Sequence, residues 1–372
     1  MTFVIATRFF LAASCVLACT APVRAQIPAP NPVPFSRPVP SGTGACSVAK
    51  SCAEVAPEII RKALGPSPLE KNLQYLSQTS QTTGRGLTAT ASAARAANWA
   101  VQAFRIAGVD GVRTEKFAVP VGSATGKAGF ESMNVVAEIR GRDLPDEFVI
   151  LAGHLDSTGN TPSSQHDSDG AAMLIDAARA IHASGSIPRR SIRFVLFTGA
   201  EQGMPGARAY VEAHGAELDR VIATIGVDGG TGSATGYSLG GRKEILAAVQ
   251  ETLAPVRPLG ANQFTTDAKI STDTLDFLLE GIPTLVPNVQ APNSASSQQS
   301  SPGAFDKTFI DALKHQVAIA AVAAYALADT EVRVGSRQSR NQVEQLLEDT
   351  NLDKQMKAAG IWSDWQSGKR GR

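Results

Sequence analysis

The chain has 372 residues, of which 43% are hydrophobic and 19% are charged, a composition typical of a globular protein. This length suits one large α/β domain with short additions at its ends. The formal net charge of +1 argues against nucleic acid as a partner, because there is no excess of basic side chains to neutralise phosphates.

Residues 1–25 have the pattern of a signal peptide. Arg8 precedes an apolar run at 9–19, and small residues lead to a cleavage site after Ala25. The apolar run is too short for a stable membrane span. The sequence therefore predicts a secreted or periplasmic protein. Lipidation at Cys19 is the alternative, since the residues before it loosely resemble a bacterial lipobox.

Two cysteines, Cys46 and Cys52, follow the signal peptide. In an exported protein, a close pair with no other thiols is expected to form a local disulfide. Residues 26–44 before the pair are rich in proline and predict a semi-extended linker. Residues 45–66 then form an N-terminal element with this cysteine pair and a short helix at 58–64.

Residues 67–333 alternate between strand and helix patterns, which predicts a single α/β domain. We expect a mixed, mostly parallel central sheet of about eight strands, flanked by helices. The expected helices are 90–107, 171–181, 207–212, 243–253 and 307–328. The expected strands include 115–119, 133–139, 148–152, 191–197, 221–227 and 282–287, with a glycine-rich loop at 229–236.

Residues 334–372 are expected to form a C-terminal addition. An amphipathic helix is predicted at 341–348. The basic end of the chain, 368–372, is interpreted as a solvated terminus, because short charge runs are usually exposed.

Chemistry-bearing side chains follow the predicted strands. His154 and Asp156 come directly after the strand at 148–152, and His166 stands just before the next helix. Glu201 and Asp228 follow the next two strands. Because parallel strands end at one edge of a sheet, this placement predicts a shared metal site of imidazoles and carboxylates.

A Gly-x-Ser-x-Gly motif at 236–240 offers a competing interpretation. It fits the nucleophile elbow of serine hydrolases, which requires a buried strand before Ser238. A glycine-rich loop is expected there instead. His315 is the one histidine downstream of Ser238, and it lies in the middle of a predicted helix. The motif is therefore not expected to be catalytic.

The order and spacing of these residues resemble the co-catalytic zinc exopeptidases, which include bacterial leucyl aminopeptidase and, more closely, the plasma glutamate carboxypeptidase group. The similarity covers about residues 68–365 and includes the runs at 132–139 and 281–283. It implies a zinc-exopeptidase fold with peptides or dipeptides as substrates or ligands. The accessory domain inserted in many such carboxypeptidases is missing, because Val119 leads almost directly to Ser132.

The resemblance also assigns site residues. The family holds two zinc ions bridged by an aspartate, with a glutamate as general base. His154 matches a histidine ligand with Asp156 behind it. Glu201 matches the glutamate ligand of the first metal, and Asp228 matches the second carboxylate ligand.

Three positions depart from the family pattern. His166 stands where the family has the bridging aspartate, Ala200 where it has the base, and Gln299 where it has the last histidine ligand. An imidazole brings no negative charge to offset two cations. A neutral amide is a poor zinc ligand, and alanine cannot accept a proton. A close metal pair is therefore not expected.

These departures favour a catalytically impaired exopeptidase homologue. It would hold one zinc ion or none, through His154, His166 and Asp228, with Glu201 nearby. One alternative is an active mono-zinc exopeptidase or dipeptidase that uses Glu201 or Asp167 as a substitute base. Another is a non-catalytic protein that binds peptides or envelope components. No feature of the sequence indicates an oligomeric state.

Overall fold

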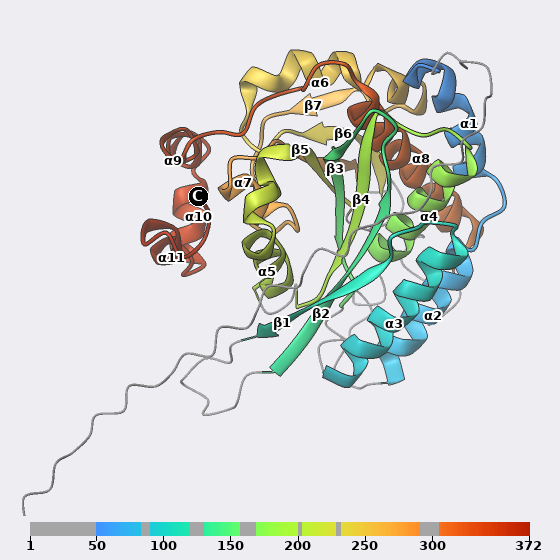
Figure 1. Cartoon of the computed structure of the whole chain (residues 1–372), viewed down its shortest axis with the longest axis horizontal. Coiled ribbons are helices and arrows are strands. Elements are labelled where there is room, and N and C mark those ends of the chain that lie inside the picture. The colour runs from blue at the N-terminus through green and yellow to red at the C-terminus, as the bar shows by residue number, and fades with distance from the viewer. Residues whose placement is uncertain are drawn as a thin grey trace, which may run out of the picture. The chain divides into compact units, whose positions relative to one another are not determined.

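An eight-stranded sheet forms the centre of the protein (Figure 1). The computed structural model describes residues 50–82, 90–119, 130–156, 169–199, 203–227, 232–290 and 305–372, all within one compact unit, Ala49–Arg372. The strands are β1 (Arg113–Val119), β2 (Phe130–Ile139), β3 (Leu144–His154), β4 (Arg190–Phe197), β5 (Val221–Gly226), β6 (Ser233–Ser238), β7 (Gln263–Thr265) and β8 (Thr284–Gln290). Their spatial order is β1-β2-β4-β3-β5-β8-β6-β7.

The middle of this sheet is parallel. Strands β4, β3, β5 and β8 are neighbours, and each adjacent pair among them runs in the same direction. The strands β1 and β2 on one side, and β6 on the other, join by antiparallel pairing. The predicted mixed, mostly parallel sheet is thus confirmed. The four parallel strands end at one edge, which we call the carboxyl edge.

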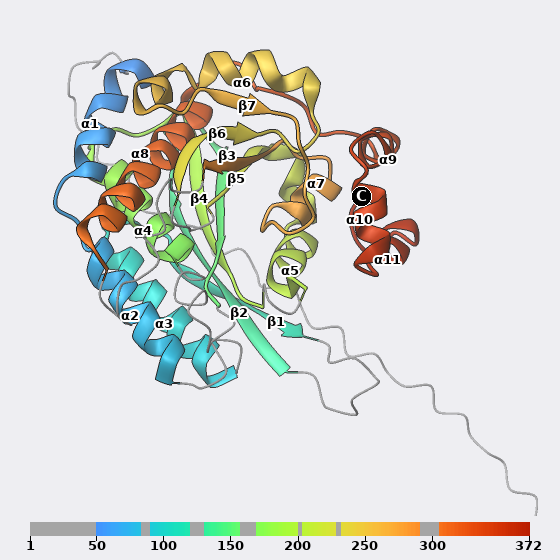
Figure 2. The same ribbon diagram turned by 180° about the vertical axis from the view of Figure 1, so that it is seen from behind.

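Helices cover both faces of the sheet (Figures 1 and 2). The α-helices on one side are α1 (Cys52–Leu64), α2 (Leu69–Thr82), α3 (Thr90–Ile106), α4 (Asp169–Ala183) and α8 (Lys307–Asp329). Those on the other are α5 (Pro205–Ala213), α7 (Leu275–Leu279), α9 (Arg340–Asp349), α10 (Leu352–Ala358) and α11 (Trp362–Gln366). The remaining helical segments are α6 (Leu246–Thr252) and the 3-10 turns η5 (Gly215–Arg220), η6 (Lys243–Ile245) and η7 (Ala254–Leu259).

Alternating residues of β3 build two cores. Val149 and Leu151 face the layer that contains α4 and α8, while Phe148 and Ile150 face the layer that contains α5 and α7. Successive strand residues point to opposite faces, so a strand covered on both sides must be apolar throughout. This explains the continuous apolar run that marks β3 in the sequence.

Helix α8 passes through the larger core. Among the described residues it is the one helix that is long and apolar enough to cross a membrane, but 78% of its apolar stretch is buried in the protein. It packs against α1 and α4 through small and branched side chains. The burial of α8 is that of a core helix.

Helix α1 is longer than the sequence analysis expected, because it begins at Cys52 rather than at residue 58. Ser51 starts it: its backbone N–H and its hydroxyl donate to the Glu54 carboxylate, at 2.7 and 2.8 Å. This capping box places Pro57 inside the helix. Cys52 is a free thiol here, and its predicted partner Cys46 lies outside the described residues, so the disulfide stays a prediction.

The interpretation of residues 368–372 as a solvated terminus is wrong for Arg370, whereas Gly368, Lys369 and Arg372 are exposed. Arg370 is 6% exposed, and its Nε and Nη2 donate to the two carboxylate oxygens of buried Asp276 at 2.7 and 3.0 Å. The N–H of Arg372 donates to the carbonyl of Leu279 on α7. A buried carboxylate needs a charged partner, and the end of the chain supplies one.

The expected glycine-rich loop is also wrong over part of its length, because residues 233–238 form β6. At Gly236 (φ +149°) a Cβ would lie 1.9 Å from the carbonyl oxygen of Gln263, so only glycine fits beside β7. Ser238 therefore does follow strand residues. However, β6 runs antiparallel to β8, so Ser238 lies away from the carboxyl edge, and its hydroxyl donates to the carbonyl of Asp267. The motif is a structural one.

Candidate metal and peptide site

The carboxyl edge gathers the candidate segments. Backbone bonds hold three strand ends together there: Leu155 N–H donates to Phe197 O at 2.8 Å, and Val227 N–H donates to Ala152 O at 2.7 Å. Four segments leave this edge: 157–168 after β3, 200–202 after β4, 228–231 after β5 and 291–304 after β8. They carry His166 and Asp167, Ala200 and Glu201, Asp228, and Gln299. All of these side chains lie outside the described residues.

His154 is the last residue of β3 and the described candidate ligand. Its side chain is 14% exposed, and its Nδ1 lies 2.9 Å from the backbone carbonyl oxygen of Asp156. A carbonyl oxygen can only accept, so Nδ1 carries the proton. The lone pair of the neutral ring is then on Nε2. Histidines that bind metals typically have this arrangement, with the other ring nitrogen donating to a carbonyl or carboxylate.

Asp156 is hydrogen-bonded to His154 through its main chain, while its carboxylate lies at ion-pair distance from the ring. The nearer carboxylate oxygen, Oδ1, is 4.0 Å from His154 Nδ1, beyond hydrogen-bonding distance. The backbone carbonyl of Asp156, rather than its carboxylate, accepts the hydrogen bond that orients the ring. The Asp156 side chain is buried at 1% exposure.

The position of His154 at the end of β3 and the hydrogen bond at its Nδ1 are compatible with zinc binding at Nε2. Among the described residues, no three His, Cys, Asp or Glu side chains gather closely enough to hold a metal. The predicted set of His154, His166, Asp228 and Glu201 therefore has one described member. The tautomer of His154 suits a ligand. Of the remaining members, His166 follows β3 itself, and Glu201 and Asp228 follow β4 and β5, which pair with β3.

A buried polar cluster at the same edge was missed in the sequence analysis. Asn134, on β2, accepts a hydrogen bond from the N–H of Thr198 at 3.2 Å and donates to the carbonyl of Gly206 at 2.8 Å. Ser132 shares a 2.7 Å hydrogen bond with the Thr198 hydroxyl. The signal that could have found this cluster is the run 132–139, which belongs to the family resemblance.

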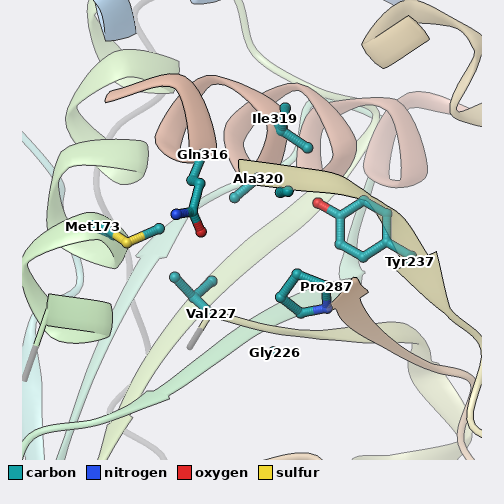
Figure 3. A pocket seen from close by; sticks show the side chains of 9 residues that line it. Met173, Gly226, Val227, Tyr237, Pro287, Gln316, Ile319 and Ala320 are labelled. Carbon is teal, nitrogen blue, oxygen red and sulfur yellow. The ribbon is translucent and has the colours of Figure 1, made fainter. Parts of the chain in front are cut away.

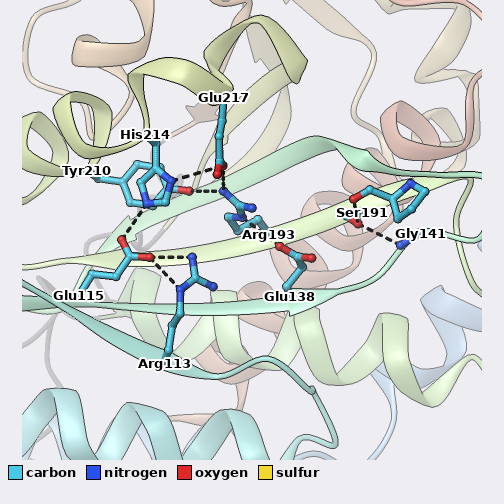
Figure 4. A network of polar contacts seen from close by, with 10 residues as sticks. Arg113, Glu115, Glu138, Gly141, Ser191, Arg193, Tyr210, His214 and Glu217 are labelled. Carbon is cyan, nitrogen blue, oxygen red and sulfur yellow. Dashed lines mark hydrogen bonds and ion pairs between the residues drawn. The ribbon is translucent and has the colours of Figure 1, made fainter. Parts of the chain in front are cut away.

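A second polar cluster lies on the face of the sheet that α5 covers, between β1, β4 and α5 (Figure 4). His214 Nε2 is 3.0 Å from Glu115, and its Nδ1 is 3.3 Å from Glu217. Arg193 Nη1 donates to Glu217 and to the Tyr210 hydroxyl, both at 3.0 Å. Burial would lower the pKa of His214, but the hydrogen bonds to the two glutamates outweigh it and raise the pKa. The pKa of Glu217 falls to about 2, chiefly through its bond to His214.

A small pocket lies beside the carboxyl edge, between β5, β6, β8 and helices α4 and α8 (Figure 3). Met173 and Val227 are among the apolar side chains that line it. Its polar side chains are those of Tyr237 and Gln316, and the Gln316 amide donates to the carbonyl of Gly232 at 2.7 Å. Burial raises the pKa of Tyr237, so the phenol stays protonated. None of the described lining groups could serve as a base at neutral pH.

The family follows from comparison with known sequences. The pattern of peptidase family M28 matches residues 134–319, from the buried Asn134 through β3, β4, β5 and β8 into α8. Carboxypeptidase Q of Rattus norvegicus is 33% identical over 153 residues, which cover 41% of this chain and 32% of that protein. Carboxypeptidase Q of Homo sapiens is 31% identical over the same length and share.

Solved structures show the same fold. A peptidase M28 precursor from Shewanella amazonensis SB2B superposes with a TM-score of 0.64 at 17% identity, covering 77% of this chain and 99% of that one. An aminopeptidase from Aneurinibacillus sp. strain AM-1 gives a TM-score of 0.55 at 14% identity, covering 78% and 98%.

The fold and the strand-end placement of His154 define a protein of the zinc-exopeptidase class. More particularly, the chain belongs to peptidase family M28. Its match spans about a third of the length of the carboxypeptidase Q proteins.

Proposed function

We propose that this chain is an exported M28 homologue that binds at most one zinc ion and hydrolyses peptides weakly or not at all. The observation that carries this proposal is Ala200, which stands where the family has its general base. A methyl group cannot take a proton from an attacking water, and general-base catalysis is typically worth about 10²–10⁴-fold.

A single zinc site is supported by the ligand types that remain. Two imidazoles, from His154 and His166, with the carboxylate of Asp228, form a recognised catalytic zinc set with room for a fourth ligand. A bound zinc ion would supply Lewis-acid polarisation of a carbonyl or a water. The chain's own contribution at His154 is to hold the tautomer that offers Nε2. Glu201 would lie near this set as a further carboxylate.

Two of the residues that hold the second metal ion in the family are replaced in this chain. His166 replaces the bridging carboxylate, and Gln299 replaces a histidine ligand. Two cations held close together require negative charge between them, which an imidazole does not provide. We therefore propose one ion rather than two. Peptides or dipeptides are the proposed ligands, as expected for a peptidase fold.

The test combines metal content with turnover. The purified mature chain is loaded with zinc, its metal is counted by elemental analysis, and aminopeptidase, carboxypeptidase and dipeptidase substrates are assayed. We expect up to one zinc per chain and turnover far below that of an M28 enzyme with base and both metals. Robust zinc-dependent turnover that is abolished in His154→Ala would overturn the proposal. It would indicate an active mono-zinc exopeptidase with Glu201 or Asp167 as base.

Export is part of the proposal. Cleavage after Ala25 would leave Cys46 and Cys52 as the two cysteines of the mature chain, and we propose that they form a disulfide. Mass spectrometry of the protein recovered from an exporting host should give an N-terminus at residue 26 and no alkylatable thiols. An N-terminus at a lipid-modified Cys19 would replace this with a lipoprotein.

A further inference from the structure

Strand β1 is an edge strand with little apolar anchoring. It stands first in the order of the sheet, so β2 is its one strand partner within the described ranges. Of its seven residues, Val119 alone is buried. Apolar burial therefore contributes little to holding this strand in place. Contacts between its side chains and other elements should matter correspondingly more.

One such contact comes from His214, at the junction of α5 and η5 (Figure 4). Its Nε2 lies 3.0 Å from a carboxylate oxygen of Glu115 on β1, and its Nδ1 lies 3.3 Å from a carboxylate oxygen of Glu217 on η5. The ring also stacks on Tyr210 of α5, with 4.2 Å between the ring centres. His214 thus joins the edge strand to two other elements.

The two carboxylates determine which form of the His214 ring fits. An ionised carboxylate only accepts hydrogen bonds, and a neutral imidazole carries a single N–H. Both contacts can be hydrogen bonds only when both ring nitrogens are protonated. A neutral ring would donate to one glutamate and turn a lone pair toward the other. The geometry is therefore that of an imidazolium ion held between two carboxylates.

The surrounding charges favour the imidazolium form. The charged and titratable groups around the ring are Arg113 and Glu115 on β1, Glu138 on β2, Arg193 on β4, Tyr210 on α5 and Glu217 on η5. With the ring protonated, the positive and negative charges of this set balance, whereas a neutral ring leaves one carboxylate in excess. Burial opposes the charged ring, but the two glutamates outweigh it and raise the pKa of His214 above its ordinary value of 6.5.

The contact with Glu115 is the one on which β1 depends. Glu217 also accepts from Arg193 Nη1 at 3.0 Å, so it keeps a partner on the sheet if the ring becomes neutral. The other partner of Glu115 is Arg113, which lies on β1 itself and ties the strand to nothing else. Among the described residues, the bond from His214 is the one side-chain hydrogen bond that connects β1 to an element other than β2.

We propose that His214 is a pH-sensitive switch: its doubly protonated ring holds edge strand β1 against α5 and η5, and loss of one proton releases the strand from them. The switch is independent of metal binding and hydrolysis, because none of its groups belongs to the candidate metal site. The contact is complete below about pH 6.5 and is lost as the pH rises through the raised pKa of the ring. The released strand is then held by its ladder with β2.

The test measures hydrogen exchange of the full chain at about pH 5.5 and about pH 9, with rates corrected for their intrinsic pH dependence. Peptides covering 113–119 report on β1, and peptides covering 192–197 report on the central strand β4. We expect the protection of β1 to fall at least about tenfold between the two pH values, because a charge-assisted hydrogen bond is lost. The protection of β4 should change little.

Two variants with matched controls assign the change to this contact. In His214→Gln and in Glu115→Ala, the protection of β1 should be low at both pH values, close to that of the unmodified chain at about pH 9. His182→Gln removes an exposed histidine on α4, and Lys116→Ala removes the neighbouring exposed charge on β1. Both controls should keep the pH dependence. The two test substitutions together should lower protection no further than either alone, because they break the same contact.

Nuclear magnetic resonance of the chain with ¹⁵N-labelled histidine reads the protons directly. The His214 signals, identified by their absence in His214→Gln, should show both nitrogens protonated at about pH 5.5 and one at about pH 9. A neutral ring at the lower pH would overturn the proposal. So would equal protection of β1 at both pH values, or a pH dependence that persists in His214→Gln. A parallel loss in β1 and β4 would also overturn it, because it would indicate general loosening rather than local release.

Discussion

The ring nitrogen Nδ1 of His154 is hydrogen-bonded to the main chain of Asp156, at 2.9 Å from its carbonyl oxygen, and lies 4.0 Å from the carboxylate. A backbone acceptor cannot be removed by substituting the side chain. It also fixes the imidazole tautomer whatever the charge of residue 156. The two residues therefore contribute differently to a metal site, and substitutions of each should differ in their effect on metal affinity.

We expect His154→Ala to reduce zinc affinity by more than about 100-fold, because losing a ligand costs more than losing an outer partner. Asp156→Asn should change it by less than about tenfold, since the carbonyl that holds Nδ1 remains. Competition titrations with a chelator measure both. His315→Ala, a half-buried histidine on α8, is the control. A loss in Asp156→Asn as large as in His154→Ala would contradict the assignment of the carbonyl.

The ion pair between Arg370 and Asp276 predicts that the end of the chain stabilises the fold. Arg370→Met should lower the free energy of unfolding by about 3 kcal/mol, because it leaves a buried carboxylate unpaired. Lys369→Met is the matched control, as it removes the same charge from the neighbouring exposed position and should cost less than about 0.5 kcal/mol. Urea unfolding curves measure both. Equal effects of the two substitutions would show that the pair contributes little.

The His214 cluster predicts a pH dependence of stability. The pKa of His214 is raised in the folded state, so its contribution is complete below the unfolded value of about 6.5 and is lost as the pH rises through the folded pKa. The pKa of Glu217 is depressed to about 2. Its contribution is present above the unfolded value of about 4.3 and is lost as the pH falls. Together the groups stabilise most between about pH 4.3 and 6.5.

Melting temperatures of the unmodified chain and of His214→Gln check this across pH 4 to 9. The difference between the two proteins should be largest near pH 5–6 and should shrink above neutral pH. Glu115→Gln should reproduce part of the effect, because it removes one of the two carboxylates that face the ring. A difference that grows with increasing pH would show that His214 is neutral in the folded protein.

The parallel core was predictable because its strands are covered on both faces. Every residue of β4 is buried, and its second half, residues 194–197, is an unbroken apolar run. Other elements lacked such a signal. Gly232 and Gly236 obscured the strand pattern of β6. Pro57 argued against a helix at the start of α1, yet the helix forms there and begins with a capping box at Ser51. The role of Arg370 depends on a partner 94 residues away, which a local charge pattern cannot reveal.

The candidate site was predictable only in part for the same reason. His154 stands at the end of an apolar strand, so its position followed from the pattern. Asn134 looks like an ordinary polar residue in a strand, and its importance lies in contacts with Thr198 and Gly206, 64 and 72 residues away. The tautomer of His154 is likewise set by a backbone atom, which carries no sequence signature.

The departures from the family pattern predict how activity could be restored. Ala200→Glu alone should give little turnover, because the bridging carboxylate and the last histidine ligand are still absent. Ala200→Glu, His166→Asp and Gln299→His together should give measurable zinc-dependent peptidase activity, since base and metals act as a unit and their effects are far from additive.

Initial rates on aminopeptidase and dipeptidase substrates, with metal counts on each variant, measure the restoration. His166→Asp with Gln299→His, but without the base, is the matched control. It should gain metal and remain at least about 10²-fold slower than the triple variant, because the proton acceptor is still missing. If that double variant were as active as the triple one, the loss of metal rather than the loss of the base would explain the weak hydrolysis.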